Sequence, residues 1–305
     1  MFFVPYKLNV DIDRWPVITF LIIALCLAVF YGQVTSRIAY SQSVKSVCGE
    51  AQAASVRDIL SRVNHEGLSC PQFWQSIKES ADPEQTIRRL AEGAGGLDHV
   101  EERRVYLDHY YTVLLREYHQ FNRVVPPNLT DRLFFDPDDP SLFSMITSSF
   151  SHGSLGHVLG NVIAFYAFAS GIEIIVGSAT FLVLVLVMSV STSLAYQMSV
   201  AGLDVAMPTH GLSGVVMGML GMLVVLVPKA RIKCFLWFIF IFKRLYVPVV
   251  FLAVGYIGWD LYSLHHERDS MINYVGHVSG ACAGLFIAVV YRIARPGYIR
   301  NLTDP

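Results

Sequence analysis

Charged residues are scarce in this chain: only 15% of its 305 residues are Asp, Glu, Lys or Arg, whereas 53% are hydrophobic. Soluble domains usually carry about a quarter charged residues. The deficit therefore argues against a soluble protein and favours one that lies in a membrane. The formal net charge is −1, so the composition gives no reason to expect a nucleic-acid partner.

Cysteine is also rare, with five residues in the whole chain. Cys48 and Cys70 flank a polar stretch, and two interpretations of them stay open, a disulfide or two free thiols. The zinc-protease pattern H-E-x-x-H is absent, and we expect neither a metal nor a cofactor. An aspartyl intramembrane protease needs paired aspartates within apolar segments, and the sequence has no such pair.

Long apolar segments are what the chain has in place of charge. A helix needs about 20 mostly apolar residues to span the hydrocarbon core of a membrane. Six segments meet this need and predict an all-α polytopic membrane protein with six transmembrane helices. A seven-helix count would require residues 234–242 to cross, and about ten residues are too few. The six segments are 15–33, 155–176, 180–201, 211–227, 246–264 and 272–292.

Basic residues predict which side of the membrane the ends of the chain face. Lys and Arg gather on the cytoplasmic side of membrane proteins. Here they precede the first segment, join the fourth to the fifth and follow the sixth, so they share one side if both termini are cytoplasmic. The middle cluster brackets residues 234–242, which we expect to lie in the membrane interface. The residues are Lys7, Arg14, Lys229, Arg231, Lys233, Lys243, Arg244, Arg292, Arg295 and Arg300.

The connection between the first two segments is much longer than the others. Apolar residues between positions 100 and 121 recur at helical spacing, and residues 51–63 have a similar pattern. We therefore expect a small helical insertion on the outer side, without chemistry of its own. The expected organisation is a cytoplasmic N-terminus (1–14), a first transmembrane helix (15–33), the outer insertion and loop (34–140), a core with helices two to six (141–292) and a cytoplasmic tail (293–305).

A serine opens the fourth apolar segment within the motif Gly211-Leu212-Ser213-Gly214. A helix N-terminus carries unpaired N–H groups and a partial positive charge, which stabilise an alkoxide and a neighbouring oxyanion. The alternative is a structural one: Ser213 caps the helix, and Gly214 and Gly218 serve close helix packing.

A histidine stands near the start of the sixth segment, beside a row of glycines. Gly276, Gly280 and Gly284 are four residues apart, so they share one helix face and let another helix approach closely. His277 flanks that face and is a candidate general base. A transmembrane histidine that only hydrogen-bonds a neighbouring helix is the alternative.

Three further polar residues lie around the start of the second segment. His157 and Asn161 are spaced i and i+4, so they project from one helix face, and His152 precedes them. Both side chains can donate hydrogen bonds, as an oxyanion hole requires. A structural polar cluster stays open as an alternative.

Depth in the membrane connects these groups. Ser213 and His157 lie 16 residues before the charged end of their helices, and His277 lies 15 residues before it. At 1.5 Å per residue, each is about 22–24 Å from the cytoplasmic boundary. In a core about 30 Å thick they therefore share a level roughly 6–8 Å below the outer surface. Unrelated polar residues rarely share a level, so we predict one hydrolytic site.

Together these residues resemble the rhomboid family of intramembrane serine proteases. The resemblance covers residues 140–292 and the first helix, and the opening of the chain resembles bacterial members. That implies a multi-pass protein of the bacterial inner membrane. The matching features are the His152, His157 and Asn161 spacing, Glu173, Gly211-Leu212-Ser213-Gly214, His277 with its glycines, Val4-Pro5-Tyr6-Lys7 and Asp13-Arg14-Trp15-Pro16.

The resemblance implies a Ser–His dyad without an acid. Ser213 attacks the scissile carbonyl of a single-span transmembrane substrate near its outer end, and His277 transfers the proton. His157, Asn161 and the Ser213 backbone N–H hold the oxyanion, and His152 supports them. The implied packing residues are Gly211, Gly214, Gly218, Gly276, Gly280, Gly284 and Glu173.

Two departures from the family pattern are evident. Met217 stands where many members have an aromatic residue that stacks on the catalytic histidine, and the first loop carries the insertion in place of a Trp-Arg pair. Two other functions remain open. An inactive relative that binds membrane clients typically loses the serine or the histidine, and both are present here. A transporter would need charged residues in the middle of its spans, whereas Glu173 and Asp260 lie near helix ends.

Overall fold

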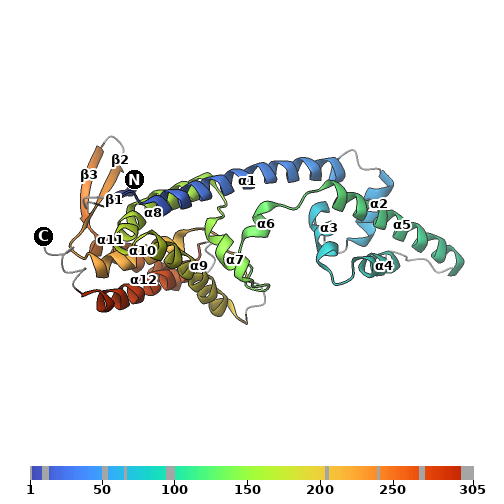
Figure 1. The fold of residues 1–305 in the computed structure, drawn as a ribbon. Coiled ribbons are helices and arrows are strands. Elements are labelled where there is room, and N and C mark those ends of the chain that lie inside the picture. Colours follow the sequence, from blue (N-terminus) through green and yellow to red (C-terminus); the bar gives the residue numbers. More distant parts are fainter. Residues whose placement is uncertain are drawn as a thin grey trace. The chain divides into compact units, whose positions relative to one another are not determined.

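A computed structural model describes residues 2–8, 14–49, 54–64, 67–93, 100–202, 206–238, 241–267 and 272–296. The chain divides into two compact units. Unit 1 consists of Met1–Gln33 and Leu129–Pro305, and unit 2 of Val34–Asn128. The described residues are mostly helical, as the sequence predicted (Figure 1).

Unit 1 is built from apolar helices of different lengths and a few short turns of helix. The first of them, α1 (Val17–Cys48), continues past the expected end at residue 33. By length and composition, four helices are apolar enough to cross a membrane: α1, α8 (Leu155–Val176), α9 (Ser178–Val200) and α12 (Tyr274–Ala294). Two further apolar helices are shorter, α10 (Ser213–Leu226) with 14 residues and α11 (Val249–His266) with 18. Between α1 and α8 lie α6 (Leu129–Leu133), α7 (Leu142–Thr147) and the 3-10 turn η1 (Ser148–Phe150).

Helix α10 is the centre of this unit, because it contacts α8, α9, α11 and α12. Its closest neighbour is α12, and glycines make that approach possible. A Cβ atom on Gly280 would overlap the backbone oxygen of Gly214, and one on Gly284 would overlap that of Gly218. The predicted glycine face of residues 276–284 is therefore the contact surface with the helix that begins at Ser213.

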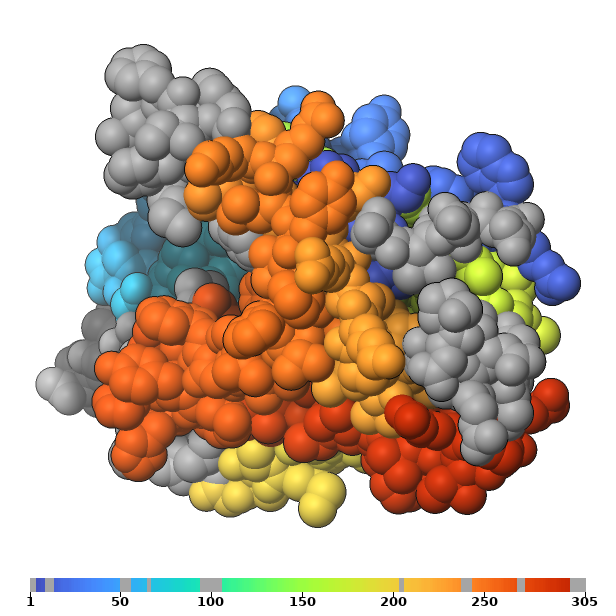
Figure 2. Space-filling model, turned by 90° about the vertical axis from the view of Figure 1, so that its left-hand side faces the viewer, coloured from blue at the N-terminus to red at the C-terminus, as the bar shows by residue number. Residues whose placement is uncertain are grey.

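A small antiparallel sheet was not expected from the sequence. Strand β1 (Phe2–Leu8) pairs with β2 (Arg231–Phe238), and β2 pairs with β3 (Ile241–Pro248). The fold is thus not all-α, and the segment that we expected to lie in the membrane interface forms a hairpin. Along β2, Arg231 is exposed whereas Ile232 and Cys234 are buried. Buried residues two positions apart show the period of a strand. The hairpin and α11, orange in Figure 2, lie together on one side of unit 1.

Glu173, near the end of α8, completes the first turn of α1. Its carboxylate accepts hydrogen bonds from the backbone N–H groups of Ile18 and Thr19, at 2.9 and 2.8 Å. It also accepts from the hydroxyls of Thr19 and Ser178, at 2.8 and 2.6 Å. The first N–H groups of a helix have no partner within the helix, so Glu173 serves as the cap of α1. The same carboxylate links α1 to α8 and α9.

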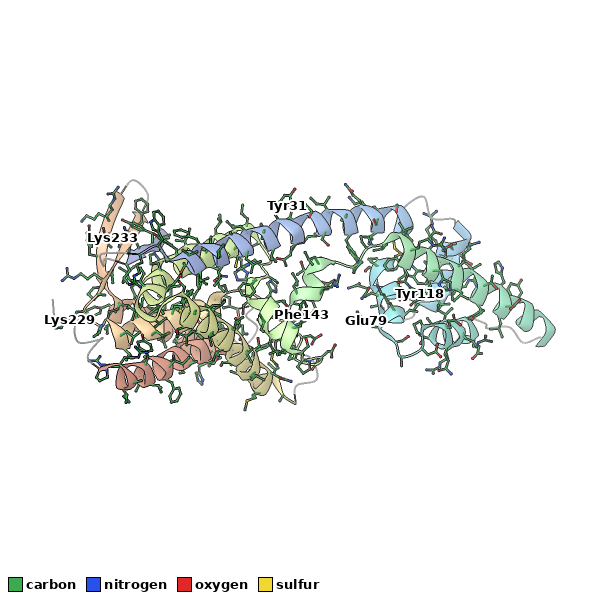
Figure 3. The ribbon with its side chains drawn as sticks, viewed as in Figure 1. Tyr31, Glu79, Tyr118, Phe143, Lys229 and Lys233 are labelled. Atoms are coloured by element: carbon green, nitrogen blue, oxygen red, sulfur yellow. A yellow bond between two sulfur atoms is a disulfide. The ribbon has the colours of Figure 1, made fainter. Side chains whose placement is uncertain are left out.

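Unit 2 is a helical domain with its own core. It contains the C-terminal part of α1, α2 (Ala54–Val63), α3 (Cys70–Glu79), α4 (Pro83–Gly93) and α5 (Val100–Val124). Trp74 is fully buried there and packs against the rings of Phe73, Tyr118 and Phe121. Figure 3 labels Tyr118 on α5 and Glu79 at the end of α3. Cys48 and Cys70 form a disulfide between α1 and α3, which was one of the two interpretations left open by the sequence.

Candidate active site

Ser213 is the first residue of α10, where the chain turns from a loop into the central helix. The turn depends on Gly211, whose φ of +124° lies in a region that other residues rarely adopt. The Gly211 N–H donates to the Ser148 carbonyl at 2.8 Å, and Thr209 pairs with Phe135 in an isolated β-bridge. The loop is therefore fixed from both sides, and the Ser213 hydroxyl lies at the positive end of a buried helix.

His277 lies in the first turn of α12, and a capping residue holds that turn in place. The side chain of Asn273 accepts a hydrogen bond from the Gly276 N–H at 2.7 Å and donates one to the Thr209 hydroxyl at 3.1 Å. This links the start of α12 to the loop that precedes Ser213. Nε2 of His277 lies 2.7 Å from Oγ of Ser213, within the hydrogen-bond reach of a general base.

The other nitrogen of the same ring meets a carboxylate. Nδ1 of His277 lies 3.1 Å from Oδ2 of Asp260 on α11. The two side chains are only 17% and 10% exposed. We expected a dyad without an acid, so this contact was not predicted from the sequence.

His157 and Asn161 lie against the loop that leads to Ser213. A Cβ atom on Gly211 would come within 2.7 Å of Nε2 of His157 and 3.6 Å of Nδ2 of Asn161. Among the residues that the structure describes, the buried Nδ2 of Asn161 meets no hydrogen-bond acceptor. An unpaired buried donor is costly, and a substrate oxygen beside Ser213 would satisfy it. The structure thus brings both predicted oxyanion donors to the loop that precedes Ser213.

His152 lies behind this pair and is fully buried. Its ring packs edge-on against that of His157, with centroids 5.0 Å apart, and its backbone N–H donates to Oε1 of Gln33 at 2.9 Å. Burial lowers the pKa of His152 from 6.5 to about 3, and the nearby His157 adds to the effect. The backbone of Phe150 raises the pKa and so opposes part of this decrease. Within the described part of the chain, neither ring nitrogen of His152 makes a hydrogen bond of standard geometry. His152 is thus a buried neighbour of His157 that is neutral at pH 7.

A serine hydroxyl, an imidazole and spare amide donors at the end of a buried helix are the components of acyl transfer. The family model described as the Rhomboid domain matches residues 139–294, slightly more than half of the 305 residues. This chain belongs to the rhomboid family. Rhomboids are intramembrane serine proteases, and the chain is accordingly a membrane protein. No curated protein is similar enough in sequence to count as a match.

In this rhomboid the aromatic neighbour of His277 comes from an unexpected position. Met217 is buried in α10, where many members have an aromatic residue. The ring of Tyr274, one turn before His277 on α12, lies edge-on to the imidazole with centroids 6.2 Å apart. The Tyr274 hydroxyl donates to Oε2 of Glu267 at 2.7 Å.

The remaining predicted residues have structural positions. Gly214, Gly218, Gly280 and Gly284 form the contact between α10 and α12, whereas a Cβ on Gly276 would meet the side chain of Asn273. Glu173 caps α1 near the C-terminal end of α8 and has no part in the Ser213–His277 contact. Among the described residues no group of three His, Cys, Asp or Glu side chains has the arrangement of a metal site.

Three residues at this candidate site were not predicted from the sequence. Asp260 is one, and a carboxylate within an apolar helix is the signal that points to it. Gln33 holds the backbone of His152, and a polar residue at the end of the first apolar segment is a weaker signal. The third is His210, whose ring lies 5.8 Å from that of His157.

Proposed function

We propose that this rhomboid is an active endopeptidase in which Ser213 is the nucleophile and His277 the general base. The observation that carries the proposal is the 2.7 Å separation between His277 Nε2 and Ser213 Oγ. The two residues are 64 positions apart in the sequence and come from different helices. A serine that served only as a helix cap would bond the backbone of its own first turn instead.

The proposed reaction is an acyl transfer in two stages. Oγ of Ser213 attacks the scissile carbonyl carbon while its proton passes to Nε2 of His277. The carbonyl oxygen becomes an oxyanion, which accepts hydrogen bonds from Asn161, His157 and the Ser213 backbone N–H. His277 then gives its proton to the leaving amine. Water, activated by the same imidazole, hydrolyses the acyl-enzyme and releases the second product.

The proposed topology has six spans, with both termini in the cytoplasm of a bacterial cell and α10 and α11 as the shorter spans. A helix of 14 residues is about 21 Å long, less than the roughly 30 Å of the hydrocarbon core. The basic hairpin that follows α10 lies at the cytoplasmic boundary in this proposal. Ser213 is at the other end of this short helix and therefore lies below the outer surface. Water reaches the serine from that side, and the lipid bilayer surrounds the helices.

The proposed substrates are single-span membrane proteins, cut near the outer end of the transmembrane helix at a small residue. Such a segment must unwind to expose its carbonyl, and the depth of Ser213 favours its outer end. Unit 2 lies on the same outer side in this proposal. Its disulfide supports that assignment, because disulfides persist in oxidising compartments and are rare in the cytosol.

The test is cleavage of a labelled single-span substrate in detergent, with the cut site mapped by mass spectrometry. We expect Ser213→Ala and His277→Ala to abolish cleavage. Asn161→Ala should retain a residual activity, lowered by about 10²–10³-fold in kcat, since other oxyanion donors remain.

A matched control is Ser279→Ala, which removes a hydroxyl from α12 that bonds the Gly276 carbonyl within its own helix at 3.1 Å. Its activity should stay close to that of the wild type. Cleavage at the same site by Ser213→Ala would overturn the assignment of the nucleophile.

A further inference from the structure

Three helices contribute to one line of polar atoms at the proposed site. Oγ of Ser213 on α10 lies 2.7 Å from Nε2 of His277 on α12. Nδ1 of the same imidazole lies 3.1 Å from Oδ2 of Asp260 on α11. The serine, the imidazole and the carboxylate thus follow one another with both ring nitrogens engaged.

The position of Asp260 calls for a specific partner. It is the only Asp, Glu, Lys or Arg between Val249 and His266, and its side chain is 10% exposed. A carboxylate within an apolar helix is costly in a membrane and is kept where it is paired. Here its partner is His277, which lies 17 positions away in the sequence, so the contact joins two helices.

We propose that Asp260 is a positioning residue that fixes the tautomer and the orientation of His277. This inference rests on the proposed function. An ionised carboxylate only accepts hydrogen bonds, so the proton of the neutral imidazole must lie on Nδ1. Nε2 then carries the lone pair and faces the Ser213 hydroxyl. The dyad of the family resemblance is extended here by a third member.

The proton balance of the reaction is unchanged by Asp260. The Ser213 proton moves to Nε2, and the imidazolium that forms keeps its Nδ1 proton. The carboxylate stays ionised and stabilises that cation, as the aspartate of soluble serine proteases does. When Nε2 passes its proton to the leaving amine, His277 returns to the neutral form with the proton on Nδ1.

Asp260→Asn tests this role, because it keeps the shape of the side chain and removes the charge. An amide can donate to Nδ1 and so stabilise the wrong tautomer. We expect kcat for the labelled single-span substrate to fall by about 10²-fold or more, with KM and the unfolding temperature within error of the wild type. Nitrogen-15 NMR of labelled histidine, assigned with His277→Gln, should show Nδ1 protonation in the wild type and its loss in Asp260→Asn.

Two further variants complete the experiment. Asp260→Glu restores an acceptor, and its kcat should be about tenfold or more above that of Asp260→Asn. Asp58→Asn makes the same change of side chain in the exposed Asp58–Arg62 pair of unit 2 and should leave kcat unchanged. If Asp260→Asn kept full kcat, or lost activity only together with thermal stability and without a change of tautomer, the positioning role would be refuted.

The two proposals fail in different ways. Full activity of Ser213→Ala would remove the proposed function, whatever Asp260→Asn does. Inactive Ser213→Ala and His277→Ala variants together with a fully active Asp260→Asn would remove the role of Asp260 alone.

Discussion

The ends of helices set the positions of single side chains here. Ser213 is the first residue of α10, and His277 reaches it from the first turn of α12. Burial determines the behaviour of His152, whose pKa is lowered to about 3 because its charged form would be desolvated. A buried histidine with a strongly lowered pKa thus lies near His277, for which we propose the role of general base.

The lowered pKa of His152 predicts a pH-dependent stability. Its folded pKa of about 3 lies below the ordinary 6.5, so the unfolded chain binds more protons between these values. Stability is therefore complete above pH 6.5 and falls as the pH is lowered, by at most about 1.4 kcal/mol per pH unit from this group. In thermal unfolding followed by intrinsic fluorescence, His152→Gln should flatten the pH dependence. His109→Gln, at an exposed position of α5, should not, and equal slopes for all three proteins would contradict the prediction.

Most residues of the candidate site were singled out by the sequence, and the reasons why the others were not are physical. Ser213, His277 and His157 stand out because polar groups in apolar segments at one depth require an explanation. Asp260 lies 16 residues after Arg244, the same separation that Ser213 has from Lys229. Its position near a helix end was noted, but no role at the site was predicted for it. The φ of Gly211 and the contacts of Gln33 arise from tertiary packing, which no local pattern encodes.

At the scale of elements, the contact between α10 and α12 holds Ser213 and His277 together. The glycine spacing predicted this contact face, because residues four apart share one side of a helix. The small sheet was not predicted. The apolar run 234–242 was too short to span and was read by length alone, whereas the alternation of Arg231, Ile232 and Lys233 indicates a strand.

Gly280→Ala should disrupt this contact. The added Cβ would overlap the backbone oxygen of Gly214, next to Ser213, and a backbone atom cannot turn away as a side chain can. We expect a loss of about 1–3 kcal/mol in stability, together with a lower kcat. The measurements are the unfolding temperature and the cleavage rate of the labelled substrate.

The control for this prediction is Gly255→Ala in α11, where an added Cβ would meet nothing within 4 Å. That variant should be as stable as the wild type or slightly more so, because alanine favours a helix. Similar results for the two variants would argue against a close contact between α10 and α12.

For the whole molecule, the division into two units means that their stabilities need not change together. Unit 1 depends on helix contacts and the Glu173 cap, whereas unit 2 has an aromatic core and the Cys48–Cys70 disulfide. Cys48→Ser combined with Cys70→Ser should therefore weaken unit 2. The disulfide closes a loop with a sequence separation of 22, for which chain entropy gives about 3 kcal/mol.

Limited proteolysis measures this effect. The double variant should be cut faster within residues 34–128 than the wild type, and a reductant should make the wild type behave like the variant. Cys282→Ser, which removes an exposed thiol of α12, is the control. An unchanged cleavage rate in the double variant would show that the disulfide does not stabilise the unit.

The Glu173 cap also has a consequence for how the protein is made. Glu173 lies 154 residues after Thr19, and its carboxylate accepts a hydrogen bond from the Thr19 backbone N–H. At a synthesis rate of roughly 5–20 residues per second, α1 leaves the ribosome on the order of ten seconds before its acceptor exists. During that interval its first turn must bond water or lipid headgroups. Helix α1 therefore enters the membrane without the Glu173 cap and gains it only after α8 has been synthesised. This sets an order for the assembly of the core.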